Sequence, residues 1–210
     1  AGMVPTPFAE QLAESVTHGL SMIHSALNQR ANFDPRHSER SFVIGMTDIG
    51  EIYFLPILMD LLRKKAPGIT VSTYRNTAGN LREDMEAGKV DLAIGLIPAL
   101  KGGFFQRRLF TQSYVCMLRK GHRLDKKRMS LAEFSAAEHL VVVSAGTGHG
   151  QVDEILRRKG VERRVVLRVP HFVAVGHILQ ATDLLATVPE RLAERMVQPF
   201  GLVALPHPAD

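Results

Sequence analysis

The regular alternation of strand-length apolar segments with helix-like segments is the feature that most constrains this fold. Residues 41–47 form a short apolar segment that predicts a strand, residues 69–74 and 91–97 also predict strands, and residues 51–65 and 81–87 between them have helical character. Consecutive strands separated by helices pair in parallel through right-handed crossovers. The first half of the chain therefore predicts an α/β unit built on a parallel sheet.

A second series of strands and helices begins after a break at residues 98–103, which contains proline and glycine. The elements expected there, in order, are strands 105–110 and 113–118, a short helix near 131–134, strand 140–144, helix 151–159, strand 164–169, helix 172–180, strand 184–188, helix 190–196 and strand 202–205. Because the series restarts here, we predict two α/β lobes, residues 41–100 and residues 101–205.

Residues 6–30 predict one long amphipathic helix, with Thr6 as the capping residue. Its apolar residues repeat at alternating spacings of four and three: Ala9, Ala13, Val16, Leu20, Ile23 and Leu27. A stripe this narrow is typical of coiled coils. The helix therefore needs a partner helix, most simply from a second copy of the chain. Residues 32–35 would end the helix, and we assign residues 1–40 to a linker helix and hinge.

Composition limits the classes of function. No apolar run approaches the ~20 residues of a membrane span, and no secretory leader is recognisable at the start. Cys116, the single cysteine, lies in an apolar segment and predicts a buried, inert thiol in a reducing cytoplasm. The net charge of +5 would suit an anionic partner. However, the basic residues are scattered in short runs without interleaved aromatics, which favours solvated faces over direct nucleic-acid binding.

Two strand-to-helix turns, at 47–51 and 144–151, are the candidate ligand-binding features. The free backbone N–H groups of a helix N-terminus attract anions, and ligands of open α/β sheets bind beyond the carboxyl ends of the strands. If the lobes sit side by side, the two turns face each other and predict a small anionic ligand between the lobes. Phe54 is close enough to the first turn to line it, and Arg191, at a helix start, is placed to pair with a carboxylate.

Other kinds of site are weakly supported. The glycines at 146–150 follow neither the dinucleotide nor the P-loop spacing, which leaves a carboxylate contact or a plain tight turn. His149 in this loop can donate to an anion or be an ordinary surface histidine. Asp48 and Glu51, at a helix start, are predicted to cap their own helix and complement its dipole. No nucleophile elbow, metal-ligand motif or cofactor loop is recognisable, so we predict no enzyme activity, metal or cofactor.

Three stretches carry a resemblance to a known family: TDIGEIYF at 47–54, GFFQRRL at 103–109 and AGTGHG at 145–150. Over residues 2–208 the chain resembles a LysR-type transcriptional regulator, in particular the branch that responds to salicylate and nitroaromatic-derived carboxylates. The resemblance implies an α/β fold of two Rossmann-like lobes, like those of periplasmic binding proteins, preceded by a linker helix that pairs in dimers. A small aromatic carboxylate effector would bind in the cleft between the lobes.

The resemblance also implies which residues contact the effector. Carried over by position, they are Thr47, Phe54, Gln112, Gly148, His149, Phe172 and Arg191. Phe172 would wall the cavity, and Arg191 matches an arginine linked to inducer response. Met59 and Arg75 match positions whose alteration changes the response in the family.

The implied partners are promoter DNA of aromatic-compound degradation genes and further copies of the chain. Family members carry a winged helix-turn-helix upstream, so DNA would be contacted by a domain outside this chain, and the linker helix would join copies into a dimer or tetramer. Family members also add a strand and a helix after the point where this chain stops, so we expect the first lobe to lack a strand. The alternatives are a solute-binding protein of transport, disfavoured by the basic pI and the coiled-coil stripe, and an enzyme acting on an aromatic acid.

Overall fold

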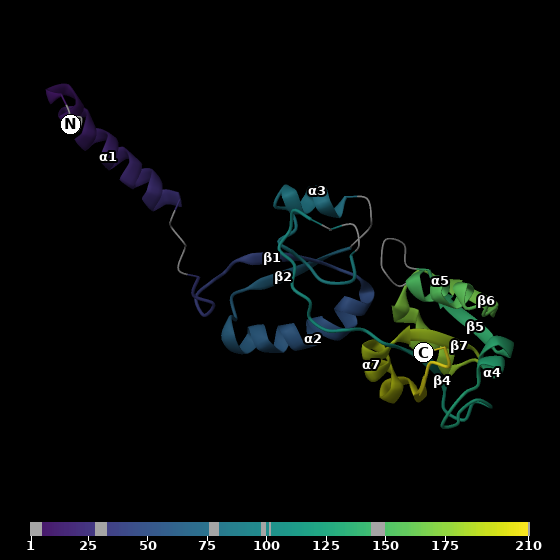
Figure 1. Ribbon diagram of the computed structural model, residues 1–210. Helices are drawn as coiled ribbons and strands as arrows, with labels where there is room; N and C mark the ends of the chain where they lie inside the picture. Colours follow the sequence, from purple (N-terminus) through teal and green to yellow (C-terminus); the bar gives the residue numbers. More distant parts are fainter. Residues whose placement is uncertain are drawn as a thin grey trace.

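The computed structural model of the chain describes residues 6–27, 33–75, 80–97, 100, 102–143 and 150–209. The described residues form two sheets, each with its own helices, and a separate N-terminal helix (Figure 1). We call the three-stranded sheet with its helices lobe I and the five-stranded sheet with its helices lobe II. The expected α/β architecture of two lobes preceded by a helix is confirmed.

The N-terminal helix α1 (Pro7–Leu27) extends away from both lobes (Figure 1). The hydroxyl of Thr6 accepts a hydrogen bond of 3.2 Å from the Ala9 backbone N–H, so the predicted cap is present. Val16 and Leu20 of the apolar stripe are exposed, and the described part of the chain offers no second helix to cover them. No helix among the described residues is long and apolar enough to cross a membrane.

Lobe I is a parallel sheet in the order β2–β1–β3. Its elements are β1 (Ser41–Met46), α2 (Asp48–Lys65), β2 (Thr70–Arg75), α3 (Leu81–Glu86) and β3 (Leu92–Ala93). The turn from β1 into α2 is tight because a Cβ on Gly50 would lie 2.9 Å from the Cβ of Met46. Glycine at this position therefore lets α2 begin directly at the carboxyl end of β1.

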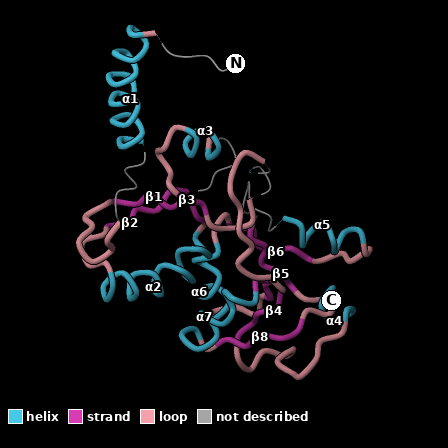
Figure 2. The backbone as a smooth tube through the Cα atoms, turned by 60° about the vertical axis from the view of Figure 1, so that its left-hand side comes forward, coloured by secondary structure: helices cyan, strands magenta, loops and turns pink. Residues whose placement is uncertain are grey.

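Lobe II is a mixed sheet in the order β6–β5–β7–β4–β8, with β5, β6 and β7 parallel and β4 antiparallel to β7 and β8. Figure 2 shows β6, β5, β4 and β8 gathered in this lobe. Its strands are β4 (Tyr114–Arg119), β5 (Glu138–Val142), β6 (Arg164–Val169), β7 (Leu185–Pro189) and β8 (Leu202–Pro206). Its helices are α4 (Leu131–Ala136), α5 (Gly150–Arg158), the 3₁₀ turn η2 (Phe172–Ala174), α6 (Val175–Gln180) and α7 (Glu190–Phe200).

The core of lobe II lies on both faces of the sheet. Met117 of β4 packs with α6 and α7 on one face, whereas Cys116 and Leu118 pack with α4 and α5 on the other. This division follows from the two-residue period of a strand. Cys116 is fully buried, as the apolar context predicted.

Several predicted boundaries need correction. Residues 105–110 form no strand; they belong to the segment that crosses from lobe I to lobe II (Figure 1), and Phe105 and Leu109 are exposed there. A strand needs a neighbouring strand to satisfy its backbone, and residues 105–110 pair with none among the described residues, so the Phe and Leu residues at the two ends of this segment misled the prediction. The predicted strand 91–97 shortens to β3, and α2 begins three residues earlier than predicted.

Candidate functional site

The two lobes meet where α2 begins. The Asp48 carboxylate accepts hydrogen bonds from the backbone N–H groups of Phe172 and Val173, the latter at 3.0 Å. These groups open η2, whose own cap residue, His171, makes no side-chain cap bond. A carboxylate of lobe I therefore satisfies a helical N-terminus of lobe II. The prediction that Asp48 caps its own helix is wrong, because the side chain points across to the other lobe.

A second contact between the lobes brings one arginine onto aromatic rings. Arg191, in the first turn of α7, donates from Nη1 to the hydroxyl of Tyr53 on α2 at 3.1 Å. Its guanidinium carbon lies 5.8 Å from the centroid of the Tyr53 ring and 5.2 Å from that of Phe110. Guanidinium groups over ring faces gain cation–π attraction, which strengthens as water is excluded.

Phe54 completes this group of side chains. Its ring centroid lies 5.1 Å from that of Tyr53, edge-on, and 6.2 Å from that of Phe110. We call Tyr53, Phe54, Phe110 and Arg191 the Arg191 cluster. It joins α2 of lobe I, the crossing segment and α7 of lobe II, so its geometry changes if the lobes move against each other.

Gln112 lies beside the start of α7. Its amide Nε2 donates to the Ser113 carbonyl at 2.7 Å, and the same carbonyl accepts the Glu190 backbone N–H at 3.0 Å. The Ser113 hydroxyl also donates to the Glu190 carboxylate. Gln112 is therefore anchored next to Arg191 by way of Ser113 and Glu190.

A small cavity of about 20 Å³ lies inside lobe II, at the carboxyl ends of its central strands. Tyr114, Arg163, Phe172 and Thr187 are among the residues that line it. Burial raises the pKa of the Tyr114 phenol to about 12. Small-molecule pockets usually enclose ~300–1,000 Å³, so this cavity would have to open before it could admit an aromatic acid.

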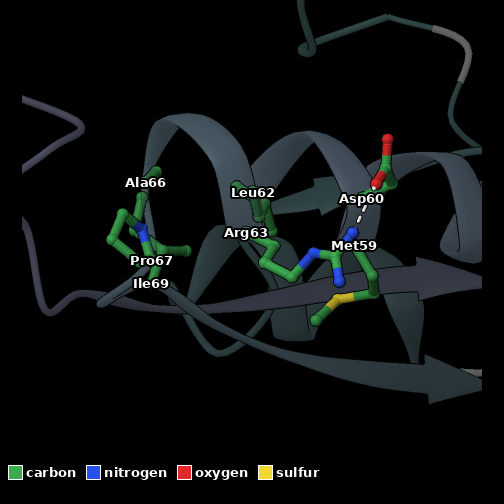
Figure 3. Close-up of a pocket in the computed structure, with 7 residues that line it drawn as sticks. All are labelled: Met59, Asp60, Leu62, Arg63, Ala66, Pro67 and Ile69. Atoms are coloured by element: carbon green, nitrogen blue, oxygen red, sulfur yellow. Dashed lines mark hydrogen bonds and ion pairs between the residues drawn. The ribbon is translucent and has the colours of Figure 1, made fainter.

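A larger, open groove of about 490 Å³ lies at the other end of α2 (Figure 3). Met59, Leu62 and Ile69 supply much of its apolar lining, and Arg63 bonds to Asp60 at 3.1 Å beside it. The groove is lined by the last turns of α2 and the turn after it, whereas Asp48 opens the helix. Its lining includes none of the seven residues predicted to contact the effector.

The structure brings some of the predicted residues together. Thr47 immediately precedes Asp48, which contacts buried Phe172; Phe54 and Arg191 share the Arg191 cluster. Gln112 donates to the Ser113 carbonyl, which also accepts the backbone N–H of Glu190 at the start of α7. The two remaining predicted residues, Gly148 and His149, lie outside the described residues. Among the described residues, no group of three His, Cys, Asp or Glu side chains could hold a metal ion.

Sequence reasoning missed Tyr53 and Phe110, and it missed the role of Asp48. Tyr53 stands next to Phe54 in TDIGEIYF, but nothing local indicates a contact with Arg191, 138 residues further on. Phe110 lies in the crossing segment and not in the strand predicted for residues 105–110. The local signal for this cluster was the adjacent aromatic residues Tyr53 and Phe54 near a helix start. Such a pair does not by itself indicate a site, because aromatic pairs are also common in hydrophobic cores.

Comparison with known proteins now identifies the family. Residues 35–210 match the LysR substrate binding domain. The chain belongs to the LysR family of transcriptional regulators. It is therefore the effector-binding part of a transcriptional regulator and not an enzyme.

Two curated relatives are similar over nearly the whole chain. The HTH-type transcriptional activator NagR of a Ralstonia species is 57% identical over 208 residues, which are 99% of this chain and 69% of that protein. The HTH-type transcriptional activator NahR of Pseudomonas putida is 53% identical over 207 residues, with the same coverage. A solved probable transcriptional regulator of Pseudomonas aeruginosa has a TM-score of 0.77 and 30% identity, and covers 99% of this chain and 70% of that one. LysR regulators bind DNA, oligomerise and respond to small-molecule effectors.

Proposed function

We propose that this regulatory domain senses a small aromatic carboxylate, salicylate-like, at the junction of its lobes. The observation that carries the proposal is the Arg191 cluster, in which a guanidinium group and three aromatic rings meet between the lobes. Arginine pairs with carboxylates, and aromatic faces stack on a benzoate ring. The resemblance to the salicylate-responsive branch favours the same class of ligand.

Each predicted residue has a defined role in this proposal. His149 and the helix N-terminus beside Gly148 hold the carboxylate. Phe54 and Phe172 pack against the ring, and Thr47 or Gln112 hydrogen-bonds a ring hydroxyl. Arg191 pairs with the same carboxylate and so links the bound ligand to α7.

The effector would act by its different affinity for two arrangements of the lobes. Asp48 and the Arg191 cluster both span the junction, so an effector that separates or closes the lobes must break or remake their contacts. In the whole regulator, the change would alter the spacing of DNA-binding domains at promoters of aromatic-compound degradation genes. We propose that the exposed stripe of α1 joins two copies, that the lobes divide near residue 100, and that the regulator works in the cytoplasm.

Isothermal titration of the chain with salicylate, benzoate and 2-hydroxycinnamate tests the proposal, because the chain has no tryptophan to report binding. We expect one-to-one binding of salicylate. Arg191→Gln and His149→Ala should each weaken it about tenfold or more, since a hydrogen bond to a charged group contributes about 1.5–3 kcal/mol.

Arg195→Gln is the matched control. Arg195 lies one turn further along α7, with its guanidinium carbon 5.2 Å from the Tyr53 ring, but it lies outside the predicted ligand set. If a folded sample gives no heat of binding with any of the three acids, the proposal that the effector is an aromatic carboxylate is refuted. Equal losses for Arg191→Gln and Arg195→Gln would refute the specific role of Arg191.

A further inference from the structure

Basic residues that are scattered in the sequence lie together at one end of lobe II. β4 runs antiparallel to β7, so its last residue, Arg119, lies near the start of β7 and pairs with Asp183 at 2.6 Å. Leu185 at the start of β7 is aligned with His139 of β5, and the first residue of β5 is aligned with Arg164 of β6. The start of β6 and the loop that follows β4 therefore lie at the same end of the sheet.

Packing places the end of α5 at this end of the sheet as well. Leu124 and Met129, from the loop after β4, belong to the same buried core as Leu156, in the last turn of α5, and Val161, just after it. In Figure 1, α4 and the end of α5 lie on the side of lobe II away from α2. We call this region the basic end; its residues are Arg119, Lys120, Arg123, Lys126, Lys127, Arg128, Arg157, Arg158, Lys159 and Arg164.

Many of these cations are neutralised by neighbouring carboxylates. Arg119, Lys126, Arg157, Arg158 and Arg164 each form an ion pair. The loop between β4 and α4 differs, because Lys120, Arg123, Lys127 and Arg128 are exposed and have no ion pair among the described residues. Four unpaired cations within nine residues make this loop the most concentrated positive charge at the basic end.

The composition of the loop narrows the class of anionic partner. Residues 119–130 contain no Phe, Tyr or Trp, so the loop offers no stacking platform for the bases of a single-stranded nucleic acid. Its large apolar residues, Leu124 and Met129, are buried, so they cannot anchor in a protein partner. The loop therefore presents mainly exposed positive charge to a partner. Exposed Lys and Arg side chains of this kind contact the phosphates of duplex DNA.

We propose that the basic end of lobe II binds the phosphate backbone of duplex DNA without reading its sequence. The end lies opposite the lobe junction, because the carboxyl ends of β5 and β7 point the other way. DNA can therefore occupy it while an effector occupies the junction, and the inference does not depend on the effector's identity. Attachment to a DNA-bound regulator would raise the local concentration of DNA and make a weak contact effective.

Fluorescence anisotropy of the chain with a short labelled DNA duplex of arbitrary sequence tests this inference. If four phosphates are neutralised, the logarithm of the association constant should fall with the logarithm of salt concentration at a slope of about −3 to −4. The variant K120Q/R123Q/K127Q/R128Q should lose binding at least tenfold and flatten that slope toward zero.

The matched control is K65Q/R107Q/R108Q/R168Q. It removes the same net charge from exposed residues that form no ion pair among the described residues and that lie outside the basic end. The control should keep most of the affinity, and circular dichroism should show that both variants fold. Equal losses in the two variants would overturn the inference, since net charge alone would then explain binding. Tighter binding of labelled poly-glutamate than of DNA would also overturn it, in favour of an acidic protein partner.

Discussion

Removal of the Asp48 carboxylate should loosen the contact between the lobes. The carboxylate accepts two backbone N–H groups across the junction, one from buried Phe172 and one from the more exposed Val173. A hydrogen bond to a charged group contributes about 1.5–3 kcal/mol, and the bond to Val173 should be at or below the lower end because water reaches it. We therefore expect Asp48→Ala to lower the free energy of unfolding by about 2–4 kcal/mol. Asp48→Asn, which keeps one oxygen acceptor, should cost about half as much.

Urea unfolding followed by circular dichroism measures this difference, because the chain lacks tryptophan. Glu51→Ala is the control: it removes a carboxylate from the same first turn of α2, and Glu51 has no hydrogen bond to lobe II among the described residues. It should cost less than about 1 kcal/mol, the usual value of a helix-dipole interaction. Equal costs for Asp48→Ala and Glu51→Ala would refute the contact, because they would assign the effect to the helix dipole.

Three further predictions concern the core and the Arg191 cluster. Burial lowers the pKa of His139 from 6.5 to about 4. As pH falls, the unfolded chain is therefore protonated at His139 at a higher pH than the folded chain. The contribution of neutral His139 to the free energy of unfolding is fully present above pH 6.5 and is lost as pH falls toward 4, about 3 kcal/mol in all. Urea unfolding at a series of pH values should show a smaller loss of stability in His139→Gln. A pH profile that the substitution leaves unchanged would contradict this prediction. Gly176→Ala would place a methyl group 2.5 Å from Cδ2 of Phe200, so thermal unfolding should show a loss of about 1–3 kcal/mol, partly restored by Phe200→Leu; a neutral effect would contradict the packing. Tyr53→Phe removes the acceptor for Arg191 and should cost about 0.5–1.5 kcal/mol in urea unfolding, with no cost if the contact is absent in solution.

The sequence by itself determined the local elements and the order of the lobes. The apolar run at 41–47, the glycine at 50 and the helical segment after it led directly to β1 and α2. These features are set by periodicity and by backbone sterics within a few residues, so one sequence is enough to recognise them. The same holds for the α1 stripe and for the burial of Cys116.

Tertiary structure alone decided how distant residues meet. Asp48 and Phe172 are 124 residues apart, and whether a carboxylate caps its own helix or another depends on how the lobes dock. Residues 105–110 begin and end with large apolar residues that suit a strand, but strand formation requires a neighbouring strand, and the described residues offer none beside this segment. The short basic runs lie in different elements, and the antiparallel register of β4 against β7 brings them to one end of lobe II. Each outcome depends on long-range pairing and burial, which sequence spacing does not encode.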